Sequence, residues 1–214
     1  MEMSPGICVN GAPRGPRLLL RLAAAAVLTL GLGGCALSPA PEPEEKAQAE
    51  DEEPAVSEQT RATFRAAVTD LQAKRYERAA RRLEPLIDHE PPLPGAQLNL
   101  GIAYRHLERF EEAEGALRTA IGQRPDWSKP HVQLGIVLRH QGLFGEAREH
   151  YEKALALDSD NATAHVNLGV LCDLYLRDLR CAVDHYERYQ ALTAEEDQQV
   201  KLWIADLNRR MEAE

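Results

Sequence analysis

The side chains that could do chemistry in this chain are its cysteines and histidines. The 214 residues include four cysteines and seven histidines. Cys172 and Cys181 could form a disulfide, remain as two thiols or contribute to a metal site. The sequence has no Gly-x-Ser-x-Gly, His-Glu-x-x-His, Gly-x-x-x-x-Gly-Lys or Gly-x-Gly-x-x-Gly motif, which are common signatures of enzymes and nucleotide-binding proteins. We therefore expect a protein that is not an enzyme and that uses neither a metal nor a cofactor.

The elements that must position these residues follow a fixed repeat. A phrase of Leu-Gly followed by apolar residues begins at Leu100, Leu134 and Leu168, so its interval is 34 residues both times. A period of this length is typical of stacked helical hairpins, each of which leaves an apolar face that the next one covers. Four histidines share the period, which favours surface stripes over a set of metal ligands: His106 with His140, and His131 with His165.

The period divides the repeat region into four units, each predicted to be two helices. The second phrase, which begins at Phe110 and again at Phe144, gives the second helix, and Pro125 ends it. The first unit is degenerate, as terminal repeats often are because one of their sides faces solvent. The predicted units are 60–93, 94–127, 128–161 and 162–196.

A glycine recurs inside the first helix of three units, at Gly101, Gly135 and Gly169. Glycine destabilises a helix interior by about 1 kcal/mol relative to alanine. Because this unfavourable residue recurs in register, we expect the missing Cβ to let the second helix approach closely. The predicted partners on that helix are the small residues Ala113, Ala147 and Ala182.

The set of repeated positions resembles the tetratricopeptide repeat over residues 60–196. The resemblance implies an all-α fold, a right-handed solenoid of four helix-turn-helix units followed by a capping helix. It also implies that the first helices line a concave groove. The aromatic residue that is usual near the start of the first helix is replaced here by Gln97, His131 and His165.

In proteins of that family the concave groove binds a segment of another protein. Side-chain amides can bond to a peptide backbone, and arginine can pair with a carboxylate. An extended peptide with an acidic group is therefore the expected ligand, and a merely solvated helix face is the alternative. The groove residues expected from the phase of the repeat are Asn99, Arg105, Lys129, Gln133, Arg139 and Asn167.

Unit four is longer than the others by one residue, since Gly169 and Ala182 are 13 residues apart where earlier units have 12. We expect the extra residue to lengthen the turn between its helices. Cys172 and Cys181 flank that turn, and in an oxidising compartment two thiols that face each other across a hairpin favour a disulfide. Two buried free thiols, or a metal site joined by a nearby histidine, remain the alternatives.

Residues 1–35 have the form of a secretory signal. Arginines precede an apolar run from Leu18 to Leu32, and the run leads into Leu-Gly-Gly-Cys. That ending resembles the lipobox of bacterial lipoproteins, which implies that Cys35 is lipidated and becomes the first residue of the mature chain. The resemblance implies an anchor in the outer membrane that faces the periplasm. A short anchor helix is the alternative.

Residues 36–59 are rich in proline and glutamate. They hold eight acidic residues and a single cation, Lys46, within a chain of net charge −9. A segment of this composition cannot bury enough apolar surface to fold, so we expect a disordered linker. The acidic balance speaks against nucleic acid as a partner, because nucleic-acid binding needs a positive surface.

The last predicted element is a capping helix over residues 197–214. The run from Thr193 to Glu196 matches a capping box, and an apolar stripe follows at helical spacing. We expect this stripe to cover the open edge of unit four, and a partner-facing patch is the alternative. The stripe consists of Val200, Trp203, Ile204, Leu207 and Met211.

Together these features predict a non-catalytic scaffold on a lipid anchor that binds a segment of another cell-envelope protein. The whole pattern is similar to that of repeat lipoproteins of Gram-negative bacteria associated with TonB-type transport. An adaptor for peptidoglycan hydrolases and a pilotin-like assembly factor for a secretin are the alternatives. An oligomer is also compatible with the sequence, since repeat arrays can dimerise through their ends.

Overall fold

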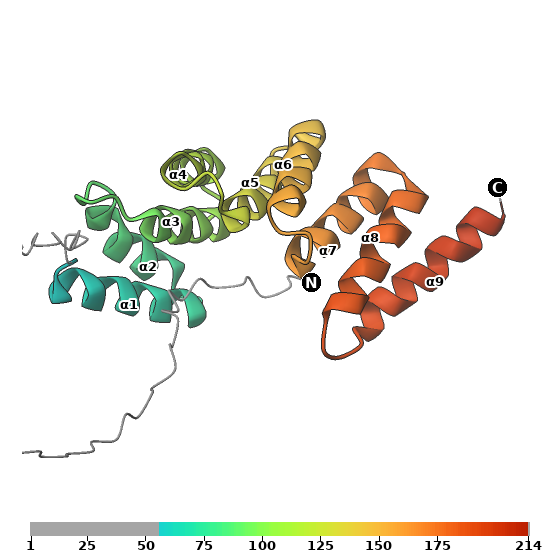
Figure 1. Ribbon diagram of the computed structural model, residues 1–214, viewed down its shortest axis with the longest axis horizontal. Helices are drawn as coiled ribbons and strands as arrows, with labels where there is room; N and C mark the ends of the chain where they lie inside the picture. The colour runs from blue at the N-terminus through green and yellow to red at the C-terminus, as the bar shows by residue number, and fades with distance from the viewer. Residues whose placement is uncertain (1–55, 214) are drawn as a thin grey trace, which may run out of the picture. The chain divides into compact units, whose positions relative to one another are not determined.

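The computed structural model describes residues 56–213, so the predicted signal, Cys35 and most of the predicted linker lie outside the described residues. Within that range every regular element is helical, and the helices form successive hairpins (Figure 1). The prediction of four helix-turn-helix units and a further helix is confirmed. The helices are α1 (Glu58–Gln72), α2 (Tyr76–Leu83), α3 (Pro94–His106), α4 (Phe110–Gln123), α5 (Ser128–His140), α6 (Phe144–Leu157), α7 (Ala162–Leu171), α8 (Leu179–Leu192) and α9 (Gln198–Glu212), with short turns η1 (Glu84–Leu86) and η2 (Cys172–Leu176).

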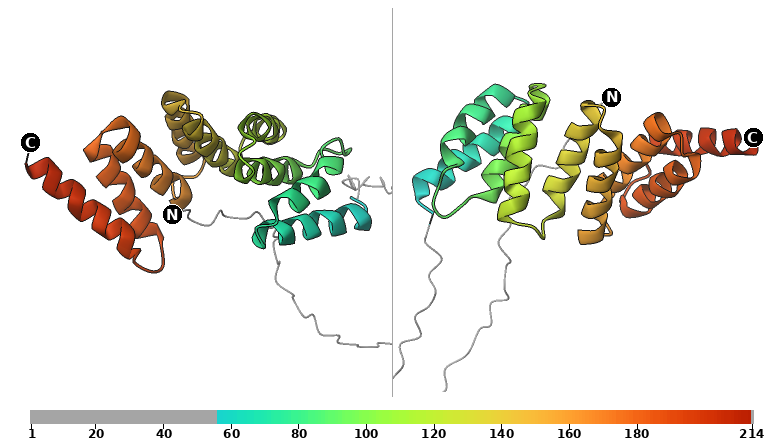
Figure 2. Two further views of the ribbon diagram at one scale, coloured as in Figure 1. Left: turned by 180° about the vertical axis from the view of Figure 1, so that it is seen from behind. Right: turned by 90° about the horizontal axis from the view of Figure 1, so that it is seen from above.

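The hairpins stack in sequence order, as two further views show (Figure 2). Each helix packs against the next one, and the first helices α1, α3, α5 and α7 also contact one another in turn. One face of the solenoid is therefore built from first helices alone, as the repeat predicts. None of the helices in the described range combines the length and the apolar character needed to cross a membrane.

A large side chain of the second helix packs against each recurring glycine, whereas the sequence suggested a small one. A Cβ on Gly135 would lie 2.6 Å from Cε1 of Tyr151, and one on Gly169 would lie 2.6 Å from Cδ1 of Tyr186. Gly101 faces Leu117 at the same distance, and the backbone oxygen of Ala113 is only the third neighbour. The prediction of Ala147 and Ala182 as partners is wrong, and Ala113 is a partner only through its backbone oxygen, because the space left by each glycine is filled by the bulkiest buried residue of the second helix.

Each hairpin turns through one residue with a positive φ angle. These residues are Lys74, Glu108, Gly142 and Arg177, and only Gly142, at φ 79°, adopts this conformation without a Cβ. In unit four the extra residue lies before the turn, where α7 continues into the π-helical turn η2. The prediction of a longer turn is wrong, because the end of the first helix absorbs the insertion as a π-type widening.

The two cysteines of unit four form a disulfide across its hairpin. Cys172 is the first residue of η2, Cys181 lies in the first turn of α8, and their Cα atoms are 5.9 Å apart. Cys172 is fully buried. The bridge therefore ties the widened end of the first helix to the start of the second.

Helix α9 packs against α8, as expected of a capping helix. Val200 and Leu207 are buried, and the ring of Trp203 lies 5.4 Å from that of Tyr186. The helix begins later than the capping-box prediction requires, because Asp197 is the N-cap and its side chain accepts hydrogen bonds from the backbone N–H groups of Gln199 and Val200. The capping-box prediction at Thr193 and Glu196 is therefore wrong.

Histidine pairs join the two helices of units three and four. Nδ1 of His131 lies 3.0 Å from Nδ1 of His150, and Nδ1 of His165 lies 2.9 Å from Nδ1 of His185. His165 Nε2 is 3.1 Å from the carbonyl oxygen of Ser159. Since a carbonyl can only accept, that nitrogen carries hydrogen, and in the neutral pair His185 donates to His165.

These pairs explain what replaces the missing aromatic residue of the repeat. In unit two the equivalent positions hold Gln97 and Ala116, which are also buried. Burial lowers the pKa of His150 to about 4, helped by the charges of His131, Lys153 and Arg118 against the opposing Glu114. Burial likewise lowers the pKa of His131, with Lys153 adding to the effect. The folded unit thus favours neutral rings.

The second pair follows the same rule. Burial and the neighbouring His165 lower the pKa of His185, Arg148 adds to this, and Asp184 and Glu152 oppose it. His131, His150 and His185 therefore resist protonation while the protein is folded.

We predict that Gly135→Ala destabilises the protein by about 1–3 kcal/mol, because the added Cβ would overlap a ring that cannot move aside. Gly115→Ala is the matched control, since Gly115 lies in α4 with nothing near the position of its Cβ. That control should gain about 0.5–1 kcal/mol from helix propensity. Urea denaturation followed by helical circular dichroism measures both, and equal effects would contradict the packing argument.

We also predict that stability falls as the pH drops from about 7 to 5. Unfolded histidines take up protons near pH 6.5, whereas His131, His150 and His185 resist protonation in the folded protein. For His150 this difference amounts to about 1–2 kcal/mol of stability by pH 5. The double variant His131→Gln, His150→Ala copies unit two and should remove this share, whereas His140→Gln, on an exposed side chain, should not. Urea midpoints across this pH range test the prediction, which fails if all three proteins respond alike.

Candidate peptide-binding groove

The predicted amide residues are mostly buried within the face formed by the first helices. Asn99 is 0% exposed and Gln133 is 5% exposed, while Asn167 is partly exposed. Asn99 donates to the carbonyl oxygen of Gly95 at 2.9 Å, and Asn167 donates to that of Thr163 at 2.8 Å. In both residues a side-chain N–H is already bonded to the preceding turn of the same helix. The structure therefore does not bring the three amides together as an open ladder.

The two predicted arginines lie further along the same face and contact rings. Nη2 of Arg105 is 2.8 Å from Nε2 of His106. The guanidinium of Arg139 lies 5.7 Å from the centre of the Tyr175 ring, and its Nη1 donates to the Tyr175 hydroxyl at 3.5 Å. Burial raises the pKa of Tyr151 to about 12, although the positive charges of Arg139 and Arg105 act against it. Both cations therefore lie close to a buried hydroxyl.

Lys129 is exposed and contributes to a small depression between three first helices. This depression, of about 60 Å³, also involves Leu98, Ile102 and Gln133. Its place between α3, α5 and α7 is where the repeat predicts a groove. It has room for about the volume of one or two ordered waters.

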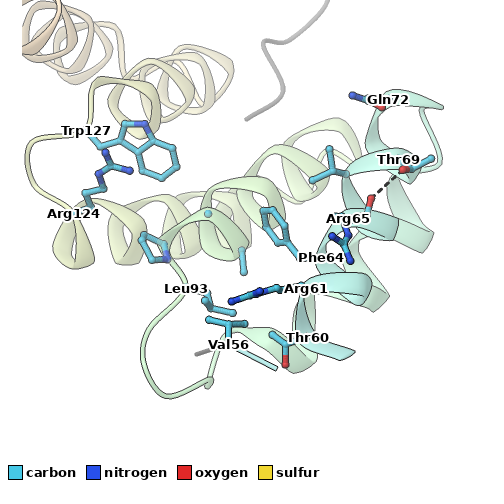
Figure 3. A pocket seen from close by; sticks show the side chains of 14 residues that line it. Val56, Thr60, Arg61, Phe64, Arg65, Thr69, Gln72, Leu93, Arg124 and Trp127 are labelled. Carbon is cyan, nitrogen blue, oxygen red and sulfur yellow. Dashed lines mark hydrogen bonds between the residues drawn. The ribbon is translucent and has the colours of Figure 1, made fainter. Parts of the chain in front are cut away.

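A second cavity is a pocket that the sequence reasoning missed. It has a volume of about 640 Å³ and lies between α1, the start of α3 and the link from α4 to α5 (Figure 3). We call it the N-terminal pocket. Its size falls within the range of small-ligand and peptide side-chain sites. Its apolar lining includes Phe64, Val68, Leu93 and Trp127.

Among the described residues, the charged side chains that line the N-terminal pocket are all positive. They are Arg61, Arg65 and Arg124, and none of the described aspartates or glutamates lines it. Arg65 pairs with Glu58 at 2.5 Å, and Arg124 lies 5.0 Å from the centre of the Trp127 ring with its nearest carboxylate, on Asp126, at 3.8 Å. All three guanidinium groups belong to exposed residues. The pocket therefore joins an apolar floor to a positive rim.

A sequence signal for this pocket existed in the residues that precede the first helices. Leu93 and Trp127 are the N-cap residues of α3 and α5, and neither makes a side-chain capping bond. The equivalent residue of unit four is Asn161, which does cap its helix by accepting from the N–H of Ala164. Apolar residues where a polar cap is preferred indicate another use of the side chain. The period hid the pocket because Phe64, Arg61 and Arg65 lie in the degenerate first unit.

No group of three or more histidine, cysteine, aspartate or glutamate side chains with the geometry of a metal site occurs between residues 56 and 213. His165 and His185 converge on each other, as described above. The structure gives no third ligand beside them.

Comparison with known proteins gives matches to repeat families. Family models described as tetratricopeptide repeat and TPR repeat match residues 70–134 and 135–172. No curated protein matches this chain.

Solved structures with the same fold are similar at low identity. MamA AMB-1 is 22% identical with a TM-score of 0.57, covering 72% of this chain and 82% of its own. PilF of Pseudomonas aeruginosa is 20% identical with a TM-score of 0.64, covering 72% and 69%. The first TPR domain of Spaghetti (RPAP3), bound to the HSP90 peptide SRMEEVD, is 21% identical with a TM-score of 0.52, covering 56% and 94%. The hairpin geometry and the two family models together show that residues 70–172 of this chain are tetratricopeptide repeats.

Proposed function

We propose that this protein is a lipid-anchored scaffold that faces the periplasm and binds an extended acidic segment of another envelope protein. The single observation that carries the proposal is the lining of the N-terminal pocket, which in the described part of the chain combines three arginines and no carboxylate with an apolar floor. Tetratricopeptide repeats act as protein-binding scaffolds, so a protein segment is the ligand that this surface suits.

The chemistry of the pocket selects the kind of segment. Arginine donates paired hydrogen bonds to a carboxylate, so the rim formed by Arg61, Arg65 and Arg124 favours aspartate or glutamate. The rings of Phe64 and Trp127 offer area on which an apolar side chain can pack. We therefore propose a ligand in which an acidic residue lies close to a large apolar one.

The arrangement of the first helices favours an extended ligand. Gly95 and Ala96 of α3 line the N-terminal pocket, and Leu98 and Ile102 of the same helix line the small depression beside Lys129. Residues this close along a helix are separated by about 1.5 Å of rise each. A single extended segment could therefore cross α3 and contact both sites.

The proposed location in the periplasm rests on two features of the cysteines. Cys35 closes a sequence that resembles a lipobox, and Cys172 and Cys181 form a disulfide. Structural disulfides persist in oxidising compartments such as the bacterial periplasm. Within the envelope we propose a role in TonB-type transport. Capture of peptidoglycan hydrolases would instead favour an adaptor for those enzymes, and capture of a secretin would favour a pilotin-like assembly factor.

The pocket is tested with a synthetic peptide in which two glutamates flank a leucine. In a Trp203→Phe background, Trp127 is the only indole of the chain and reports on the pocket. We expect saturable binding that changes Trp127 emission, and we expect the pair Arg61→Glu, Arg124→Glu to weaken it about tenfold at low salt, since each reversal turns attraction into repulsion.

The matched control is the pair Arg148→Glu, Arg180→Glu, which changes the net charge equally on α6 and α8. It should leave affinity close to that of the parent. Equal loss in both pairs would mean that the peptide responds to overall charge, and absence of any saturable binding would overturn the proposed pocket.

The anchor is tested by Cys35→Ala in cells of a Gram-negative host. We expect the parent to incorporate labelled palmitate and to fractionate with the outer membrane. The variant should lose the label and move to the soluble fraction, because a lipid chain supplies about 0.8 kcal/mol of membrane affinity per buried CH₂. A variant that stays membrane-bound would contradict lipid anchoring.

A further inference from the structure

We propose that the chain's own acidic run, Glu50–Glu53, occupies the N-terminal pocket, so that a partner segment must displace it. This inference rests on the proposed function, because it assigns a resident competitor to the same pocket. The experiment below distinguishes this occupant from two others, which are a second copy of the chain and a partner segment without any resident competitor.

The first argument is the point at which the described chain begins. Val56 lines the N-terminal pocket, and Figure 3 shows it with Leu93 and Arg61 at one end of it. Glu53 is three residues before Val56 and Glu50 is six before it. An extended chain spans at most about 3.3–3.6 Å per residue, so all four carboxylates are held within about 20 Å of Val56 whatever path the chain takes.

This tether gives the acidic run a large advantage over a free ligand. Groups joined by a short chain meet at an effective concentration in the millimolar range. A segment with only millimolar intrinsic affinity would therefore fill a substantial share of the pockets. A partner segment would need tighter binding to displace it.

The second argument is charge complementarity. The run Glu-Asp-Glu-Glu carries four successive carboxylates, and the pocket presents Arg61, Arg65 and Arg124 with no acidic residue among the lining residues that the structure describes. Within residues 56–213, the guanidinium of Arg61 makes no hydrogen bond or ion pair, and its backbone N–H is bonded to the carbonyl oxygen of Ser57. Arg65 and Arg124 form ion pairs with Glu58 and Asp126, which lie near them in sequence. Attraction between such charges is strongest at low ionic strength, because the Debye length is about 10 Å at 0.1 M salt and about 30 Å at 0.01 M. The rim is therefore positive toward the chain that enters it.

The third argument is the apolar step between the acidic run and the pocket. Pro54 and Ala55 connect Glu53 to Val56, whose side chain is already partly buried. The pocket floor beside it is formed by Phe64 and Leu93. The acidic run is therefore joined to the apolar floor of the pocket by a short apolar segment that ends in Val56.

The experiment uses the full chain with Trp203→Phe, purified in detergent, so that acrylamide quenching reports the exposure of Trp127. The test variant is Glu50→Gln, Asp51→Asn, Glu52→Gln, Glu53→Gln. The control variant is Glu42→Gln, Glu44→Gln, Glu45→Gln, which removes like charges further from Val56. Both keep the length of the segment.

We expect the test variant to raise the quenching constant about twofold and to raise the affinity for the glutamate–leucine peptide about threefold or more, because the tethered competitor is lost. The control variant should match the parent. Sodium chloride at 0.5 M should raise quenching in the parent and leave the test variant unchanged, since screening releases only an electrostatic contact.

Equal quenching in the parent and the test variant at low salt would overturn the inference, and quenching that depends on protein concentration would assign the pocket to a second copy. If the peptide binds all three proteins equally, the inference is wrong and the proposed function stands. If the peptide binds none of them, the proposed function is wrong, and the quenching comparison still decides whether the acidic run covers Trp127.

Discussion

The contact on which the whole array depends is that between a residue without a side chain on the first helix and the bulkiest buried residue of the second. Gly135 against Tyr151 and Gly169 against Tyr186 leave no room for even one methyl group. The pair sets how closely the two helices of a hairpin approach. Because each hairpin then offers the same apolar face to the next, the four units stack in one direction and the first helices come to lie side by side.

This stacking buries several of the polar side chains that the sequence predicted to bind a ligand. Asn99 and Gln133 are buried among the first helices, and Asn99 bonds to its own helix. The groups that remain available belong to exposed residues of the first unit and of a unit boundary, such as Arg61 and Arg124. The N-terminal pocket, with room for a ligand, accordingly lies at the end of the array formed by the described repeats, beside the first helix α1.

Units three and four contain further stabilising contacts at positions that differ between the repeats. Histidine pairs take the place of an aromatic contact, and the folded state keeps His150 and His185 neutral because both are buried. In unit four a one-residue insertion widens the last turn of the first helix, and Cys172 within it is bonded to Cys181. The repeat thus tolerates local changes as long as the glycine contact is kept.

The sequence by itself determined the helical hairpins, their number and their order, because a 34-residue period of apolar positions can be satisfied only by stacking equal units. It also marked the glycines as contact points. Only the tertiary structure decided what fills those contacts, that Asp197 and not Thr193 begins the last helix, and that the insertion lies in η2. The N-terminal pocket was likewise hidden, because Phe64, Leu93 and Trp127 come together from separate elements whose approach depends on packing distances that no local pattern encodes.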